Sequence, residues 1–112
     1  MFIKKIHKTP CYKMANFSAK DSGLPLDIWL DSIGCKYKSP RVKIGRKNGI
    51  LISVCIKPTR LLGNNRFYKD TDINEVLEFI ERNQNILLKH WNKELTDLQA
   101  LIELQKSVRN KE

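Results

Sequence analysis

The chain has 112 residues, of which 41% are hydrophobic and 29% charged, and its formal net charge at pH 7 is +9. This length supports a single domain with one hydrophobic core. No apolar run approaches the ~20 residues that a transmembrane helix needs, and charged residues interrupt the apolar stretch at the N-terminus, so we expect a cytoplasmic protein without a membrane partner.

The positive charge is concentrated in the first two thirds of the chain. Residues 1–70 contain fifteen Lys or Arg and four Asp or Glu, a net charge of +11, whereas residues 71–112 contain six and eight, a net charge of −2. Such an asymmetry of charge gives information about binding partners rather than about the fold. It fits a surface that binds polyanions, and it also fits solvated lysines that keep a small protein soluble. Charge alone does not decide between them.

The N-terminal part of the chain is typical of short strands separated by turn residues, with FIKKI and CYKMANFSA as the first two candidates. In the next segment, LDIWLD, Ile28 and Leu30 alternate with Trp29 and its two flanking aspartates, so the two sets should point to opposite faces of a sheet. Asp27 and Asp31 would lie about 13 Å apart at ~3.3 Å per residue, too far to share a metal ion. We expect both to pair with lysines across the sheet.

The strongest strand signal is a hairpin in the segment RVKIGRKNGILISVCIK, where Asn48-Gly49 is a turn dipeptide. A two-residue turn would place Lys43 among apolar side chains. A three-residue loop, Lys47-Asn48-Gly49 with Gly49 left-handed, instead places the apolar positions of both strands on one face. That register pairs Ile44 with Ile52, Val42 with Val54, Lys43 with Ser53 and Arg41 with Cys55, and it turns Ile50 and Ile56 inward as well.

This hairpin places basic side chains on its outer face and at its loop, and more follow it in the sequence. The candidate nucleic-acid-binding residues are Arg41, Lys43, Arg46, Lys47, Lys57, Arg60 and Arg66. Tyr37, Phe67 and Tyr68 lie nearby in sequence, and a cationic surface with stacking rings is typical of nucleic-acid binding. The alternative is a set of solvated cations on the open face of a one-sided antiparallel sheet.

Residues 58–71 are expected to form a connecting loop, because Pro58, Gly63 and two asparagines interrupt any long regular element. Its apolar side chains should pack onto the core; they are Leu61, Leu62, Phe67 and Tyr68.

Two helices are expected after this loop, over residues 72–92 and 96–109. Asp72 with Glu75, and Thr96 with Gln99, match the spacing of N-terminal capping residues. The stripe of the first helix consists of Ile73, Val76, Leu77, Ile80, Leu87, Leu88 and Trp91. We expect Trp91 to be a core side chain. His90 lies off the stripe and should be a boundary or exposed residue.

The last helix has its own stripe, formed by Leu98, Leu101, Ile102, Gln105 and Val108. This helix either completes the core or contacts a partner. The partner could be a second copy of the chain, which would give a homodimer. Leu98, Leu101 and Val108 are the candidate partner-binding residues.

No catalytic, cofactor or metal motif is visible in the sequence. Cys11, Cys35 and Cys55 are widely spaced, and the two histidines, His7 and His90, do not complete a zinc-binding set. No nucleophile with a neighbouring base is apparent. We therefore expect a protein that is not an enzyme and needs neither a cofactor nor a metal ion.

Three segments carry a family resemblance: SPRVKI, GILISVCIKPTRLLGN and VLEFIERNQNILLKHWNKEL. They resemble small bacterial proteins of domain-of-unknown-function type that have a Pro-His-x-His strand and a helix ending in Leu-Leu-x-x-Trp. The likeness covers residues 22–93, and residues 87–91 match the helix ending. It implies a small sheet-plus-helix protein, often in mobile-element or toxin–antitoxin-like gene settings. Arg41 and Lys43 stand where the histidines are expected, so no histidine-based role carries over.

Together these patterns predict one α+β domain over residues 1–112, with residues 1–57 mainly β. An antiparallel sheet of about four or five strands should pack on the helix of residues 72–92, with a second short helix after it. The function we expect is a small non-enzymatic accessory binding module whose basic sheet face engages nucleic acid or a nucleoprotein. The alternative is a phage- or plasmid-type inhibitor or antitoxin-like protein that binds a protein target such as a defence nuclease or toxin. A hydrolase whose site assembles only in three dimensions ranks last.

Overall fold

The structure is a computed structural model, and it describes residues 14–31 and 39–110. The predicted α+β fold is confirmed: five antiparallel strands form one sheet, in which each strand pairs with the next along the chain. The strands are β1 (Met14–Phe17), β2 (Asp27–Asp31), β3 (Arg41–Gly45), β4 (Leu51–Cys55) and β5 (Arg60–Leu61), and the helices are α2 (Ala19–Ser22), α3 (Asp70–Arg82), α4 (Gln84–Trp91) and α5 (Asp97–Asn110). The strand expected at FIKKI lies outside the described residues, as do His7, Cys11, Cys35 and Tyr37.

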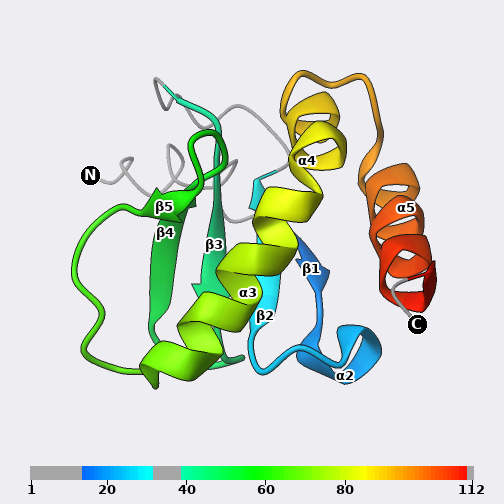
Figure 1. Cartoon of the computed structure of the whole chain (residues 1–112). Helices are drawn as coiled ribbons and strands as arrows, with labels where there is room; N and C mark the ends of the chain where they lie inside the picture. The colour runs from blue at the N-terminus through cyan, green and yellow to red at the C-terminus, as the bar shows by residue number, and fades with distance from the viewer. Residues whose placement is uncertain (1–13, 32–38, 111–112) are drawn as a thin grey trace, which may run out of the picture.

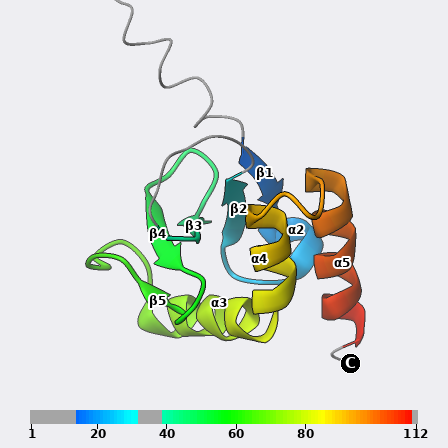
Figure 2. The same cartoon turned by 90° about the horizontal axis from the view of Figure 1, so that it is seen from above.

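The three longer helices lie on one side of the sheet. Figure 1 shows α3 crossing in front of the strands, and Figure 2, seen from above, shows α3, α4 and α5 on the same side of them. Helix α4 contacts β2, and α5 contacts β1 and α4. The sheet therefore has one face toward the helices, which we call the core face, and an opposite face that none of these three helices covers.

The period-2 alternation of the strands fills the core face with apolar side chains. Ile28, Ile44 and Ile52 lie side by side across β2, β3 and β4 and are buried. Leu30, Val42 and Val54 form the next row, and Phe17 extends the layer on β1. The predicted register of the β3–β4 hairpin is thus confirmed, including the pairs Lys43–Ser53 and Arg41–Cys55.

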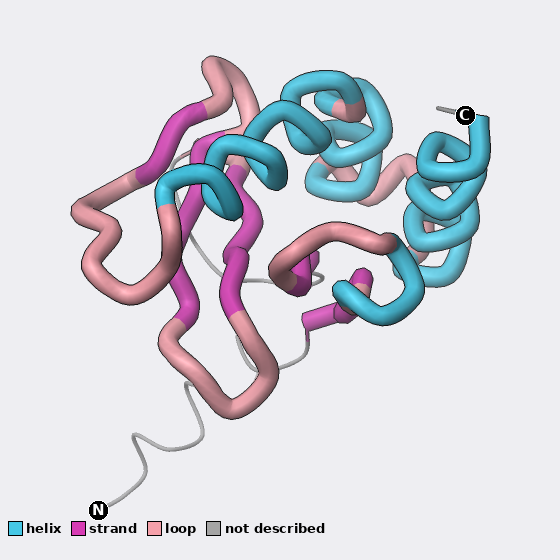
Figure 3. Tube along the Cα trace, turned by 60° about the horizontal axis from the view of Figure 1, so that its bottom comes forward, coloured by secondary structure: helices cyan, strands magenta, loops and turns pink. Residues whose placement is uncertain are grey.

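The loop of this hairpin is longer than predicted. The last pair is Gly45–Leu51, so five residues rather than three connect the strands, and Ile50 is 49% exposed instead of inward. The left-handed residue is Asn48, with φ of 66°, and not Gly49, whose N–H donates to the carbonyl of Arg46 at 2.8 Å. Asparagine tolerates this conformation, so the turn dipeptide is used one position earlier than expected. Figure 3 shows the loop extending beyond the ends of its two strands.

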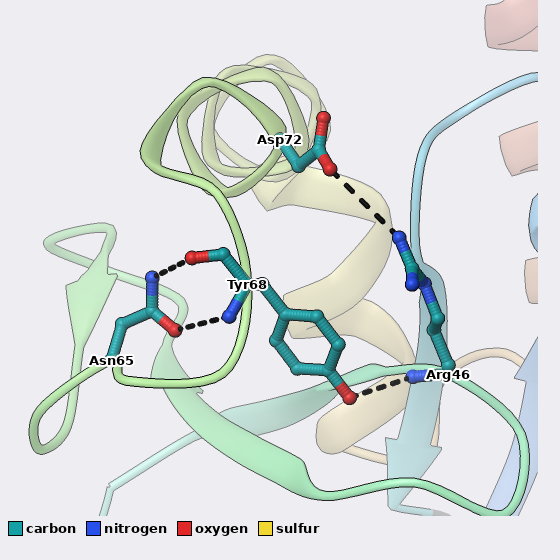
Figure 4. Close-up of polar contacts among 4 residues, drawn as sticks. All are labelled: Arg46, Asn65, Tyr68 and Asp72. Atoms are coloured by element: carbon teal, nitrogen blue, oxygen red, sulfur yellow. Dashed lines mark hydrogen bonds and ion pairs between the residues drawn. The ribbon is translucent and has the colours of Figure 1, made fainter.

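Tyr68 ties the segment before α3 to this loop (Figure 4). Its hydroxyl donates to the carbonyl of Ile50 at 2.6 Å and accepts from the backbone N–H of Arg46 at 3.1 Å. The side chain of Asn65 holds the Tyr68 backbone from the other direction, accepting from its N–H at 3.1 Å and donating to its carbonyl at 2.7 Å. The expectation that Phe67 packs on the core is wrong, because it is 58% exposed. The connecting segment also contains β5, which the sequence did not predict.

The predicted single helix over residues 72–92 is wrong, because it is interrupted at Asn83. The buried Asn83 side chain donates from Nδ2 to the carbonyl of Phe79 at 2.8 Å, and Asn83 separates α3 from α4. Helix α3 also begins earlier than predicted, at Asp70, and its N-cap residue Lys69 makes no side-chain capping bond. Asp72 therefore lies inside the first turn rather than at the cap.

The interruption at Asn83 changes which side chains of α4 face the core. Leu87 and His90 are buried, whereas Trp91 is only half-buried and lies outside the core cluster. Both expectations for this pair are therefore corrected. His90 is 6% exposed, and its Nε2 forms a 2.7 Å hydrogen bond with Oδ1 of Asp97 at the start of α5. This bond closes the turn between the two helices, which is a structural role.

Helix α5 begins where the sequence predicts. The capping box is formed, because the Thr96 N–H donates to Oε1 of Gln99 at 2.9 Å and the Gln99 N–H donates to Oγ1 of Thr96 at 3.1 Å. The predicted stripe, however, is only partly inward. Ala100 and Leu104 are fully buried, Leu101 and Val108 pack partly against the core, and Leu98 and Ile102 are 67% and 46% exposed.

Candidate nucleic-acid interface

The polar positions of the strands share the face opposite the core. Asn16, Trp29, Lys43 and Ser53 pair in one row across β1 to β4, and Arg41, Cys55 and Arg60 pair in the next row across β3 to β5. These seven residues define what we call the open face. Its side chains are half-buried apart from the buried Cys55 and the exposed Arg60.

The structure divides the seven predicted cations into separate groups. Arg41, Lys43 and Arg60 lie on the open face, and Lys57 is exposed just beyond the β4 end at which Arg41 and Arg60 are paired. The other cations lie elsewhere: Arg46 and Lys47 are in the β3–β4 loop, and Arg66 is in the segment between β5 and α3. Arg46 follows Arg41 by five positions, about 16 Å at ~3.3 Å per residue. The hairpin therefore does not form one continuous basic surface.

Arg46 is engaged within the molecule. Its guanidinium lies 4.0 Å from the carboxylate of Asp72, and it stands over the Tyr68 ring at 5.6 Å from the centroid (Figure 4). These contacts link the loop to α3, and the Arg46 side chain remains 64% exposed.

Two cations of the open face are not neutralised by carboxylates within the described residues. The ion pairs found there involve Arg46, His90 and Lys106, and none involves Lys43 or Arg60. Arg41 hydrogen-bonds to Ser39, with Nη2 3.2 Å from the hydroxyl oxygen. Lys43 and Arg60 are therefore the open-face cations on which an attraction for polyanions depends.

Trp29 is the residue of this face that the sequence reading missed. Among the aromatics expected to stack, Phe67 lies in a loop and Tyr68 is held by the hairpin. Trp29 instead sits directly between Asn16 and Lys43 in the paired row. The alternation in LDIWLD already placed Trp29 on the polar face, but only the pairing of β2 with β3 reveals its cationic neighbour.

Two polar atoms in this row, Oδ1 of Asn16 and Nε1 of Trp29, are buried and have no hydrogen-bond partner among the described residues. The two residues are cross-strand partners. An unpaired buried polar group costs about 1–3 kcal/mol, so an acceptor and a donor left unpaired side by side are unusual in a stable domain.

Asp27 has a structural role rather than the expected lysine pairing. Its Oδ1 accepts a 2.6 Å hydrogen bond from the backbone N–H of Ala19, and the side chain is buried. It thereby holds the first turn of α2, a helix that the sequence did not predict.

Other kinds of site find no support in the part of the chain that the structure describes. There, no group of three or more His, Cys, Asp or Glu side chains is arranged to hold a metal ion. Residues 14–31 and 39–110 also contain no helix with the length and apolar composition needed to cross a membrane.

The comparisons with known proteins add no identification: no protein family, curated protein or solved structure matches the chain.

Proposed function

We propose that the protein is a small non-enzymatic binding module whose open face engages nucleic acid. The observation that carries the proposal is the alignment of Arg41, Lys43 and Arg60 on a sheet face that the long helices leave uncovered. Lys57 adds a fourth cation at the same end. Clustered Lys and Arg side chains displace the counterions condensed on a phosphate backbone, which supplies most of the non-specific binding energy.

Salt dependence tests this proposal. If Lys43, Lys57 and Arg60 each neutralise one phosphate, log K should fall against log salt with a slope of about −2 on single strands and about −2.7 on duplex DNA. The measurement is fluorescence anisotropy of a labelled oligonucleotide between 50 and 300 mM salt. Absence of binding at the lowest salt, or an affinity that does not change with salt, would refute the proposal.

A second function, binding to a protein target as an inhibitor or antitoxin-like partner, is favoured by one observation. Leu98 and Ile102 are adjacent on the outer surface of α5 and are exposed, whereas Leu101 and Val108 of the predicted partner-binding set face the core. Exposed apolar pairs on a helix are suited to protein contacts. A complex that survives high salt and dissociates when Leu98 is changed to Ser would favour this second function.

A further inference from the structure

We infer that the open face binds single-stranded rather than duplex nucleic acid, by stacking a base on the indole ring of Trp29. This inference rests on the proposed function and names its ligand class. It starts from the position of Trp29, which pairs directly with Lys43 across β2 and β3. Paired side chains on one sheet face have Cβ atoms about 4.5–5.5 Å apart. The two side chains therefore begin side by side on one face of the sheet.

The cations extend from this ring in one direction. Arg41 lies two residues from Lys43 along β3, about 6.6 Å away, and Arg60 is two strands farther across the sheet. A strand of nucleotides laid along this line would meet an aromatic surface first and then a series of positive charges. That combination matches the repeating chemistry of single strands, in which each base carries a flat face and each linkage a negative charge.

A duplex cannot use the same arrangement. Its bases are stacked inside the double helix, so Trp29 would find no exposed base face, and only phosphate contacts would remain. An extended sheet face with a stacking ring is also the surface on which common RNA-binding domains splay out unpaired bases. Helices α3, α4 and α5 cannot enter a groove beside these cations, because they lie on the other side of the sheet (Figure 2).

Two buried, unpaired polar atoms lie in the same row as Lys43. Nε1 of Trp29 is a donor and Oδ1 of Asn16 is an acceptor, and neither has a partner among the described residues. Base edges carry donors and acceptors side by side. Because the indole N–H lies in the plane of the ring, the stacked base itself cannot reach it; the edge of a neighbouring base would supply partners for both atoms once the packing over them is displaced.

The test compares three probes of equal length: an oligo-dT, an oligo-U and a mixed-sequence DNA duplex, each of 12 nucleotides or base pairs. The chain has two tryptophans, so Trp91→Phe leaves Trp29 as the sole indole fluorophore. We expect both single strands to quench its fluorescence and to bind at least about tenfold more tightly than the duplex. Base–aromatic stacking predicts that Trp29→Leu weakens single-strand binding about 5- to 150-fold, measured by anisotropy of the labelled oligonucleotide, and leaves duplex binding within about twofold.

Trp29→Phe is the matched control, because it keeps an aromatic face and should retain most of the single-strand affinity. Equal affinity for duplex and single strand, with Trp29 fluorescence unchanged, would overturn the single-strand inference while leaving the proposed function in place. Failure of all three probes to bind would overturn both. If Trp29→Leu does not fold, as judged by its circular dichroism, the quenching and the single-strand to duplex ratio of the Trp91→Phe variant still decide the question.

Discussion

Changing Lys43 and Arg60 together to glutamate is expected to weaken nucleic-acid binding by about 100-fold or more. The double variant removes two of the three cations of the open face and adds two carboxylates, which repel phosphates at close range. A loss of 1.4 kcal/mol for each reversed charge already corresponds to tenfold per site. Neither side chain forms an ion pair among the described residues, so the fold should be unaffected. The measurement is anisotropy of a labelled single strand at 150 mM salt.

The control for this prediction is Lys20→Glu with Lys89→Glu. Both lysines are exposed, on α2 and α4, and their reversal changes the net charge by the same amount. At 150 mM salt the Debye length is about 8 Å, so distant charges contribute little. We expect this control to bind within about threefold of the unchanged protein. Equal losses in the two double variants would mean that net charge alone drives binding, and would remove the open face from the explanation.

The largest effect on stability is expected for Phe79→Ala, at about 3–5 kcal/mol of unfolding free energy. Phe79 is 2% exposed and stacks on Phe17 with ring centroids 5.7 Å apart, joining α3 to β1. Removing its ring leaves a cavity between helix and sheet that the rigid strands cannot close. Urea denaturation monitored by circular dichroism measures the change.

Phe67→Ala is the matched control, since the same ring is removed from a side chain that is 58% exposed. A change of at most about 0.5 kcal/mol is expected there. If both variants lose the same stability, Phe79 does not occupy the core position assigned to it.

The pairing of the strands was predictable because a period-2 pattern of apolar residues is compatible with few registers. In the hairpin, one register alone placed the apolar residues of both strands on one face, and the structure adopts it. The loop was not predictable in the same way. The loop depends on Gly45, because a Cβ added there would collide with the carbonyl of Ile50. It also depends on the Tyr68 hydroxyl, which comes from a later segment and donates to the same carbonyl.

The helical part of the chain was predicted correctly, but the helix residues that face the core were not. The apolar stripe fits one continuous helix, whereas the structure divides it at Asn83, a buried polar residue whose Nδ2 donates to the carbonyl of Phe79. In α5 the apolar residues cover more than one face of the helix. Sequence cannot tell which part is buried, and the small Ala100 rather than the large Leu98 faces the core.

The candidate site was predictable in part. Strand alternation correctly indicates that Arg41 and Lys43 share a face, because this depends on local geometry alone. It does not reveal that Arg60 joins them, because β5 is only two residues long and lies in a segment that resembles a loop. Nor does it reveal that Arg46 is held by Asp72, a contact between residues far apart in the chain.

The most direct measurement is a titration of the isotope-labelled protein with a single-stranded oligo-dT, followed by amide and indole chemical shifts. Binding at the open face predicts that the largest shifts occur at the Trp29 indole N–H and at the amides of Lys43 and Ser53, with α5 unchanged. Shifts that instead cluster around Leu98 and Ile102, or that are absent at saturating oligonucleotide, would contradict the assignment of the sheet as the nucleic-acid interface.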